Sequence, residues 1–254
     1  GTTAVRIDAG GIDFTLQHST VTSTTTGVLV ASAAVTGVVV RDSILRNNTL
    51  AFDSLSAAVR VENNTIYAEA STTANDGVRI LDAVGTGTIV AGNEVYKVAV
   101  SPTSTYGGTG IRVETAGFEV YGNTVHHFAV AGIRLVDPTS ATTSRSYDNL
   151  VYANKGVGLL VDKYGEHSDS ELRESDVGVR LAGSFAGVVH NLEVWKNRIG
   201  ADVQKGELRD SRIYGNTADG VQVGFENIAF RLNFGLATIR GNTVFNNATG
   251  IADR

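Results

Sequence analysis

Side chains that could transfer protons are concentrated in one short segment, Val161 to Asp176, with the sequence VDKYGEHSDSELRESD. Removing the proton beside a sugar carboxylate needs a base such as Lys, His or Tyr, and a cation that stabilises the negative charge that develops. The segment supplies both kinds of group, and its catalytic candidates are Lys163, Tyr164, His167 and Arg173. A solvated polar loop has the same composition, so both interpretations stay open.

Arginine recurs at the middle position of a hydrophobic triplet that follows a glycine. In the motifs GVRI, GIRV, GIRL and GVRL these residues are Arg79, Arg112, Arg134 and Arg180, which we call the arginine line. A guanidinium group can hold a carboxylate or sulfate through two parallel hydrogen bonds. If the triplets stack in register, the line either binds a polymer of repeated anionic groups or forms salt bridges with carboxylates on the same surface.

Insertions interrupt the repeats at residues 71–76, 101–109, 136–145 and 225–236. In a repeat protein such insertions project as loops, which could wall a cleft beside the arginine line. Tyr106 lies in the second insertion and could stack on a sugar ring there. The substrate-binding candidates are therefore the four arginines and Tyr106.

The elements that must position these residues form a repeat. The triplets recur with a basal period of 20 to 22 residues, and each is followed by a block such as VAGNEVYK or VYGNTVHH, in which two short strands flank a polar turn. Short β-branched strands without a helical period predict an all-β solenoid, a parallel β-helix of about 10 rungs, as one domain over residues 1–254. The leucine-rich repeat is the competing solenoid, but the chain lacks its regular leucine spacing.

Alternation within each triplet predicts which side chains form the core. The first and third residues, such as Val78 and Ile80, should point inward, whereas the arginine between them points to solvent. The polar residue of each second block should lie at a corner, tolerate a left-handed conformation and form a hydrogen-bonded ladder with its equivalents on other rungs. The glycine that opens the next triplet should supply the next corner. The predicted corner residues are Ser43, Asn64, Asn93, Asn123, Asn149, Ser211 and Asn242.

Composition argues against several partners. With no cysteine, the chain has neither disulfides nor a cysteine metal site, and a net charge of -5 does not favour nucleic acid. No apolar run is long enough for membrane insertion. No calcium-binding nonapeptide repeat appears, and the adjacent His126 and His127 should point to opposite faces of a strand, so we expect neither a metal nor a cofactor.

Both ends of the chain look like repeat sequence. AVRID near the start fits the triplet, and GIADR at the end begins another one. An uncovered terminal rung presents unpaired strand edges to water. We therefore expect a segment of a longer chain, whose neighbouring domains or another copy cover the solenoid ends.

The pattern N-x-V-Y-x-N…G-I, over residues 27 to 250, resembles the right-handed parallel β-helix proteins of the pectate lyase-like superfamily. The repeats are similar to those of bacterial mannuronan C5-epimerases. The resemblance implies a right-handed, single-stranded β-helix, a secreted or cell-surface location and an acidic polysaccharide as partner. Those epimerases carry an Asp-Pro-His-Glu motif. Here Asp137 and Pro138 occupy its first two places, but Thr139 and Ser140 replace the His and Glu, so Asp137 is either a catalytic candidate or a turn opener.

Two functions from different classes follow. The first is an extracellular module that acts as a rigid scaffold or a carbohydrate-contacting surface. The second is a polysaccharide lyase or C5-epimerase that acts on an acidic polysaccharide such as a polyuronate. An enzyme should bring a base and cations together in a groove, whereas a scaffold should show dispersed charges.

Overall fold

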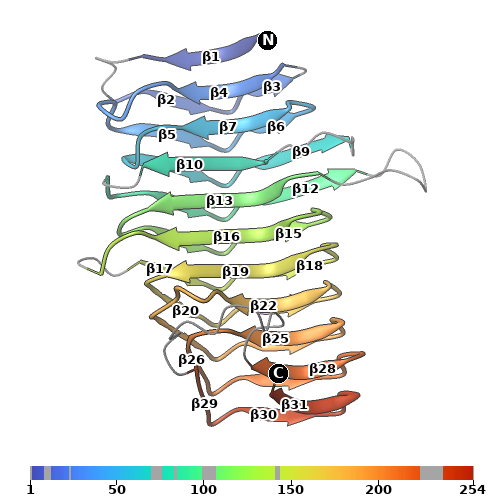
Figure 1. Ribbon diagram of the computed structural model, residues 1–254. Helices are drawn as coiled ribbons and strands as arrows, with labels where there is room; N and C mark the ends of the chain where they lie inside the picture. The colour runs from blue at the N-terminus through green and yellow to red at the C-terminus, as the bar shows by residue number, and fades with distance from the viewer. Residues whose placement is uncertain are drawn as a thin grey trace, which may run out of the picture.

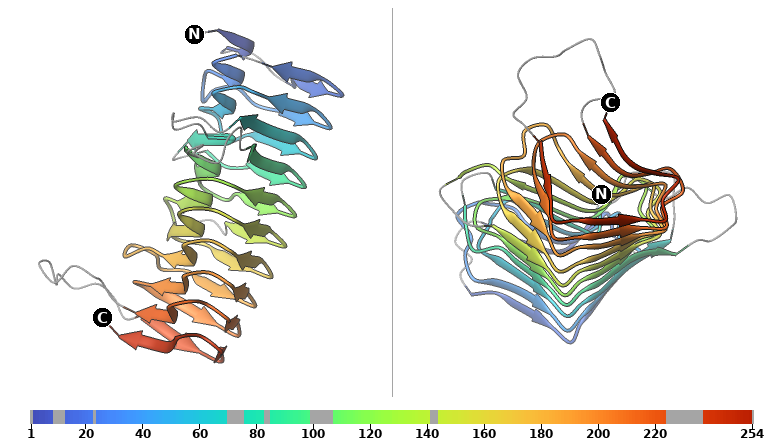
Figure 2. Two further views of the ribbon diagram at one scale, coloured as in Figure 1. Left: turned by 90° about the vertical axis from the view of Figure 1, so that its right-hand side faces the viewer. Right: turned by 90° about the horizontal axis from the view of Figure 1, so that it is seen from below.

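The computed structural model describes residues 2–8, 13–22, 24–69, 76–82, 85–98, 107–140, 144–223 and 237–253. These residues form a solenoid with three parallel sheets and a core enclosed between them (Figure 1). Seen from below, successive rungs share one bent outline, and each is displaced from the one before it (Figure 2). The predicted all-β, right-handed parallel β-helix is confirmed, and sheets of ten and eleven strands match the expected number of rungs.

Each rung contributes one strand to each sheet. The first sheet contains β1 (Thr3–Ile7), β4 (Thr26–Val30), β7 (Leu50–Ser54), β10 (Val78–Asp82), β13 (Thr109–Thr115), β16 (Ala131–Asp137), β19 (Val157–Lys163), β22 (Val177–Leu181), β25 (Ile199–Val203), β28 (Asp219–Val223) and β31 (Thr249–Asp253). The second contains β2 (Thr15–Gln17), β5 (Val38–Arg41), β8 (Val59–Glu62), β11 (Ile89–Ala91), β14 (Glu119–Tyr121), β17 (Arg145–Tyr147), β20 (Glu166–Ser168), β23 (Val188–His190), β26 (Gly206–Arg209) and β29 (Ala237–Arg240). The third contains β3 (Thr20–Thr22), β6 (Ile44–Arg46), β9 (Thr65–Glu69), β12 (Glu94–Val98), β15 (Thr124–His126), β18 (Leu150–Tyr152), β21 (Glu171–Arg173), β24 (Glu193–Trp195), β27 (Arg212–Tyr214) and β30 (Thr243–Phe245).

Inward side chains form continuous lines along the solenoid, as the alternation predicts. In the first sheet, Ile111 pairs in register with Val78 on one side and Ile133 on the other, and all three are fully buried. The second sheet has an inward line of aliphatic residues with two polar members, Ser146 and His167. The whole line is Leu16, Val40, Val61, Val90, Val120, Ser146, His167, Val189, Leu208 and Ile239.

The predicted corner ladder lies between the second and third sheets, and we call it the first corner ladder. The backbone N–H of Asn64 donates to Oδ1 of Asn93 at 3.0 Å, and Asn93 donates in the same way to Asn123. These side chains are buried, so each rung satisfies polar groups of the next. The left-handed conformation, however, belongs to the residue before each ladder position, such as Asn63 with a φ of 54°.

The triplet glycines do not act as predicted. Gly110 lies within β13 in extended backbone rather than at a left-handed corner. A Cβ on Gly110 would lie 2.4 Å from Cγ1 of Val125 and 2.6 Å from the carbonyl oxygen of Gly132 on the next rung. Glycine is required here because stacked rungs approach too closely for a side chain.

No described helix is long and apolar enough to cross a membrane.

Candidate functional site

A second ladder of corner side chains lies between the third and first sheets, and two consecutive rungs interrupt it. On one side of the interruption, the backbone N–H of Thr24 donates to Oδ1 of Asn48 at 3.2 Å. On the other, Phe128 donates to Asn154 at 2.9 Å. We call this the second corner ladder. It continues through Ser175, Asn197, Asn216 and Asn247.

The interruption comes from β9 and β12, which run for five residues where other strands of the third sheet run for three. In neighbouring rungs the residue that leaves the third-sheet strand turns left-handed, as Asn47 and Ala153 do with φ values of 54° and 53°. Ala68 and Lys97 stay extended and pair in register. Local rules of a fold are most often broken where function requires it, so this corner is a candidate site.

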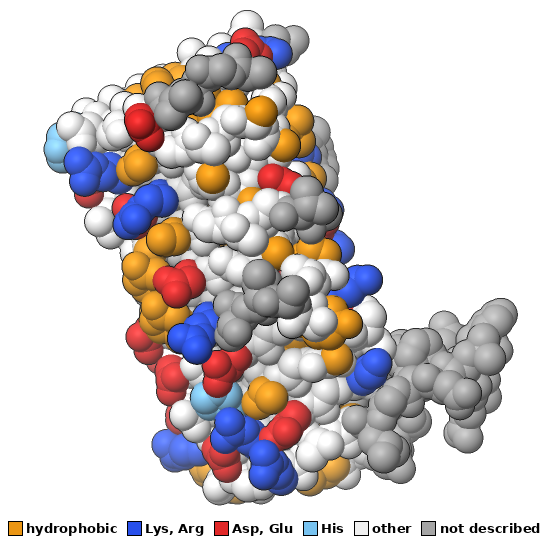
Figure 3. Space-filling model, turned by 90° about the vertical axis from the view of Figure 1, so that its left-hand side faces the viewer, with side chains coloured by type: hydrophobic (Ala, Val, Ile, Leu, Met, Phe, Trp, Pro, Cys, Tyr) orange, Lys and Arg blue, Asp and Glu red, His pale blue; other side chains and the backbone are white. Residues whose placement is uncertain are grey.

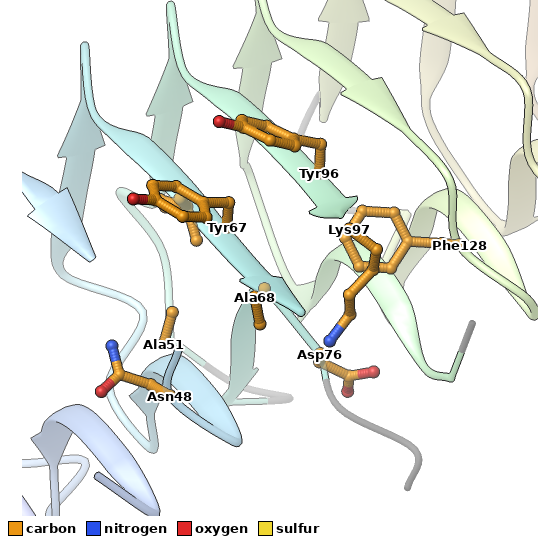
Figure 4. A pocket seen from close by; sticks show the side chains of 10 residues that line it. Asn48, Ala51, Tyr67, Ala68, Asp76, Tyr96, Lys97 and Phe128 are labelled. Carbon is orange, nitrogen blue, oxygen red and sulfur yellow. The ribbon is translucent and has the colours of Figure 1, made fainter. Parts of the chain in front are cut away.

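Lys97 is buried at the interruption, with only 5% of its surface exposed. It lines a small cavity together with Asn48, Asp76 and Phe128 (Figure 4). Its Nζ lies 5.8 Å from the centre of the Phe128 ring and forms no hydrogen bond or salt bridge with any described residue. Burial lowers the pKa of Lys97 to about 8, and the nearby Asp76 carboxylate opposes that shift.

Asp76 lines the same cavity as Lys97 (Figure 4). Its Oδ1 accepts a hydrogen bond of 2.7 Å from the backbone N–H of Thr109, which fixes the carboxyl group at the edge of the first sheet. The cavity has a volume of about 10 Å³, which is room for roughly one water molecule. The lining therefore includes a donor, Lys97, and an acceptor, Asp76, beside a space that fits one small polar group.

Planar side chains form a line on the outer face of the third sheet, beside this cavity. Tyr67 and Tyr96 stack with ring centres 5.3 Å apart, and His126 follows at 5.0 Å. Farther along, the Arg173 guanidinium lies 4.5 Å from the centre of the Tyr152 ring. We call this line the planar ladder. Its members are Tyr67, Tyr96, His126, Tyr152, Arg173, Trp195, Tyr214 and Phe245.

Two neighbouring members of the planar ladder, Tyr96 and His126, carry no charge near neutral pH. Burial and the adjacent His127 lower the pKa of His126 to about 4, so its imidazole is neutral at pH 7. Burial also raises the pKa of Tyr96, whose phenol therefore keeps its proton. Because each ring covers a face of its neighbour, the ladder presents ring edges and polar tips to solvent.

Sequence reasoning missed both features, although one of them has a sequence signal. Each planar residue stands three positions after its residue of the first corner, as Tyr96 does after Asn93 and Trp195 does after Leu192. Lys97 carries no signal of its own. Only the lack of a turn and a corner residue after Tyr96 marks its position.

The arginine line forms as predicted, because Arg79, Arg112 and Arg134 pair in register on consecutive strands. Each of these side chains has a carboxylate partner. Arg112 Nε lies 2.8 Å from Glu114, and Arg134 Nη2 lies 3.4 Å from the same residue.

The other two members find their partners at the same position on a neighbouring rung. Arg79 binds Asp53 through two hydrogen bonds of 2.9 and 2.7 Å, and Arg180 contacts Asp202 at 2.6 Å. A glycan carboxylate would therefore have to displace an existing partner. Tyr106 and the insertions 71–75 and 225–236 fall outside the described residues.

The catalytic candidates of Val161–Asp176 are not brought together. His167 is fully buried between Phe118 and Phe185, and burial lowers its pKa to about 3. Its Nδ1 lies 2.8 Å from the Ser146 hydroxyl. His167 thus points into the solenoid core, where a polysaccharide has no access.

Arg173 belongs instead to the planar ladder, with Glu171 at 3.0 Å and Glu174 at 3.2 Å. Lys163 and Tyr164 lie beside Asp137, at the turn after the first sheet. Tyr164 lines a hollow of about 420 Å³ on the second-sheet side.

Asp137 is buried, and its carboxyl group organises a turn. Its Oδ1 accepts a hydrogen bond of 2.9 Å from the N–H of Thr139, and its Oδ2 accepts one from the Ser144 hydroxyl. This geometry supports the turn-opening role. Catalysis by Asp137 stays a prediction.

Charges on the second-sheet side are mixed rather than gathered by sign (Figure 3). Arg145 lies 3.7 Å from Glu166, and Arg240 lies 2.6 Å from Glu207. Across the described ranges, no group of three His, Asp or Glu side chains is placed to hold a metal ion.

The parallel sheets, stacked rungs and corner ladders define a right-handed β-helix protein. The chain belongs to the family described as the right-handed β-helix region, whose model matches residues 3–174. No curated protein sequence matches the chain.

Two solved structures match the chain. The enzymatically active domain of tailspike protein 2 of bacteriophage CBA120 matches with a TM-score of 0.56 and 9% identity, over 74% of this chain and 33% of that one. The A-module of the mannuronan C-5 epimerase AlgE6 of Azotobacter vinelandii matches with a TM-score of 0.44 and 14% identity, over 96% and 88%. The chain thus spans a third of the tailspike domain's length.

Proposed function

We propose that this chain is a polysaccharide-contacting module, in which the planar ladder is the contact surface and the solenoid is its rigid support. The observation that carries this proposal is the ladder itself, with one planar side chain on each of eight consecutive rungs of the third sheet. Such a regular line suits an extended polymer with a short repeat. We place the module outside the cell, secreted or at the cell surface, where such polymers occur.

The rigidity of the support favours this function. The first corner ladder and the buried aliphatic lines hold every rung in register, so the positions of the ring edges are set before a polymer binds. A pre-organised surface loses little conformational entropy on binding. Tyrosine also adds few rotatable bonds while offering both an apolar edge and a hydroxyl group.

Native gels that contain dextran, xylan, alginate or pectate test this function, because a polymer that binds the protein retards its migration. We expect retardation in at least one gel, and its loss in the double variant Tyr96→Ala/Tyr152→Ala. Tyr121 and Tyr147 are a matched control, because their rings also stack, 4.9 Å apart, but on the second sheet. Tyr121→Ala/Tyr147→Ala should migrate like the parent. Equal loss in both variants, or no retardation of the parent, would refute the proposal.

One observation favours the enzymatic alternative. A lyase or epimerase needs a base, and the lowered pKa of Lys97 favours the neutral amine that could accept a proton. Incubation with alginate or pectate tests this alternative through the ultraviolet absorbance of an unsaturated product, or through a change in uronate composition. Activity of the parent that is lost in Lys97→Met would support an enzyme, whereas an inactive parent favours the contact module.

A further inference from the structure

The cavity beside Lys97 contains polar groups whose hydrogen-bonding needs are complementary. The ammonium group has three donors and no acceptor, and none of these donors reaches an acceptor among the described residues. Asp76 uses Oδ1 for the backbone of Thr109 and lines the same cavity as Lys97 (Figure 4). Lys97 is buried beside the apolar Phe128 ring, so a hydrogen-bond acceptor in the cavity would stabilise its ammonium group.

The size and charge of the cavity determine which chemical group it can bind. It has room for about one water-sized group. A hydroxyl group has that size, and it can accept from Lys97 and donate to Asp76 at the same time. A carboxylate is larger and can only accept, and it would also meet the negative charge of Asp76.

The cavity is continuous with the planar ladder. Tyr67 and Tyr96 belong to the ladder and also line the cavity, together with Lys97 on the same strand as Tyr96 (Figure 4). A sugar residue bound at the Tyr67 and Tyr96 end of the planar ladder would therefore lie next to the cavity. The aromatic wall gives the sugar an apolar surface, and the two charges fix its orientation.

We propose that this cavity is a subsite for one hydroxyl group of a neutral sugar residue, which accepts a hydrogen bond from Lys97 and donates one to Asp76. This inference rests on the proposed polysaccharide-contacting function and names an uncharged glycan as the class bound. A hydroxyl subsite at this corner also explains why the corner turn is absent after β9 and β12. A regular corner asparagine would fill the space that the hydroxyl group occupies.

Lysine resonances provide a direct test on the full chain, which has only five lysines: Lys97, Lys155, Lys163, Lys196 and Lys205. The protein is labelled with ¹³C-lysine, and the Lys97 ε-methylene signal is assigned by its loss in Lys97→Met. D-glucose, D-galactose, D-mannose and D-xylose are then titrated separately, with sodium D-glucuronate as the anionic comparison. We expect at least one neutral sugar to shift the Lys97 signal saturably, while the Lys163 signal stays unchanged.

The variant Asp76→Asn separates the proposed geometry from a simple cation site. Loss of the carboxylate acceptor should weaken binding of that neutral sugar about tenfold or more, because hydrogen bonds to charged groups are the stronger ones. Saturable binding of glucuronate alone, tighter neutral-sugar binding in Asp76→Asn, or no saturable shift with any neutral sugar would each overturn the inference. Ladder-dependent retardation in the gels would survive such a result, so failure of the subsite is distinguishable from failure of the proposed function.

Discussion

Acid should destabilise this protein through His167, and the size of the effect follows from where the side chain lies. His167 occupies a fully buried place in the inward line of the second sheet, between Ser146 and Val189. Its pKa is lowered to about 3 in the folded state by burial, against an ordinary value of 6.5. The imidazole stays neutral in the fold but takes up a proton in the unfolded chain below pH 6.5.

The sign and size of the effect come from proton linkage. Because the unfolded state binds the extra proton, the free energy of unfolding falls as pH falls from 6.5 toward 3. Between pH 7 and pH 5, this one group lowers the free energy of unfolding by about 2 kcal/mol. His126, with its pKa lowered to about 4, adds to the acid sensitivity of the parent protein.

A double variant isolates the contribution of His167. Ser146→Val/His167→Val completes the aliphatic line and leaves no hydroxyl group buried without its imidazole partner. Urea unfolding, followed by circular dichroism and Trp195 fluorescence, gives the free energy of unfolding at pH 7 and pH 5. The loss between these pH values should be about 2 kcal/mol smaller in the variant than in the parent. An equal loss in both proteins would show that His167 does not stay neutral in the fold.

Three further substitutions test the structural roles of other residues. Asn123→Leu removes a buried member of the first corner ladder and should lower the free energy of unfolding by about 1 to 3 kcal/mol; an unchanged denaturation midpoint would contradict a structural role. Gly110→Ala places a methyl group against the next rung and should cost about 1 to 3 kcal/mol, whereas Gly250→Ala meets no atom within 4 Å and should be neutral in the same urea titration. Arg112→Ala/Arg134→Ala should change stability by less than about 1 kcal/mol, because partly exposed ion pairs contribute little; a larger loss would mean that these pairs hold the first sheet together.

The fold was predictable because its determinants repeat along the chain. The turn sequence around Asn93 identifies this residue as a corner residue, and the same local pattern recurs on other rungs. The arginine line was predictable for the same reason. Its partners Asp53 and Asp202 were not, because each lies on a neighbouring rung, 26 and 22 residues away along the chain.

The candidate site was harder to predict because it depends on the absence of a corner turn. Lys97 has its unusual environment because no turn follows Tyr96, so an ordinary polar position becomes a buried one. The triplet glycines show the opposite problem. The glycines suggested a left-handed backbone. At Gly110, however, glycine is required because the next rung lies too close for a side chain, and this contact is visible only in the folded structure.

The planar ladder has a fixed pitch, so under the proposed function it would discriminate between polymers by the length of their repeat. Neighbouring strands lie about 4.8 Å apart, and the backbone hydrogen bonds between them leave little freedom to adjust that distance. A polymer whose repeat differs from the pitch by about 0.4 Å drifts out of phase by roughly 3 Å across eight rungs. A short oligosaccharide tolerates this mismatch, but a long one does not. Discrimination between glycans should therefore grow with chain length, even though every rung makes the same modest contact.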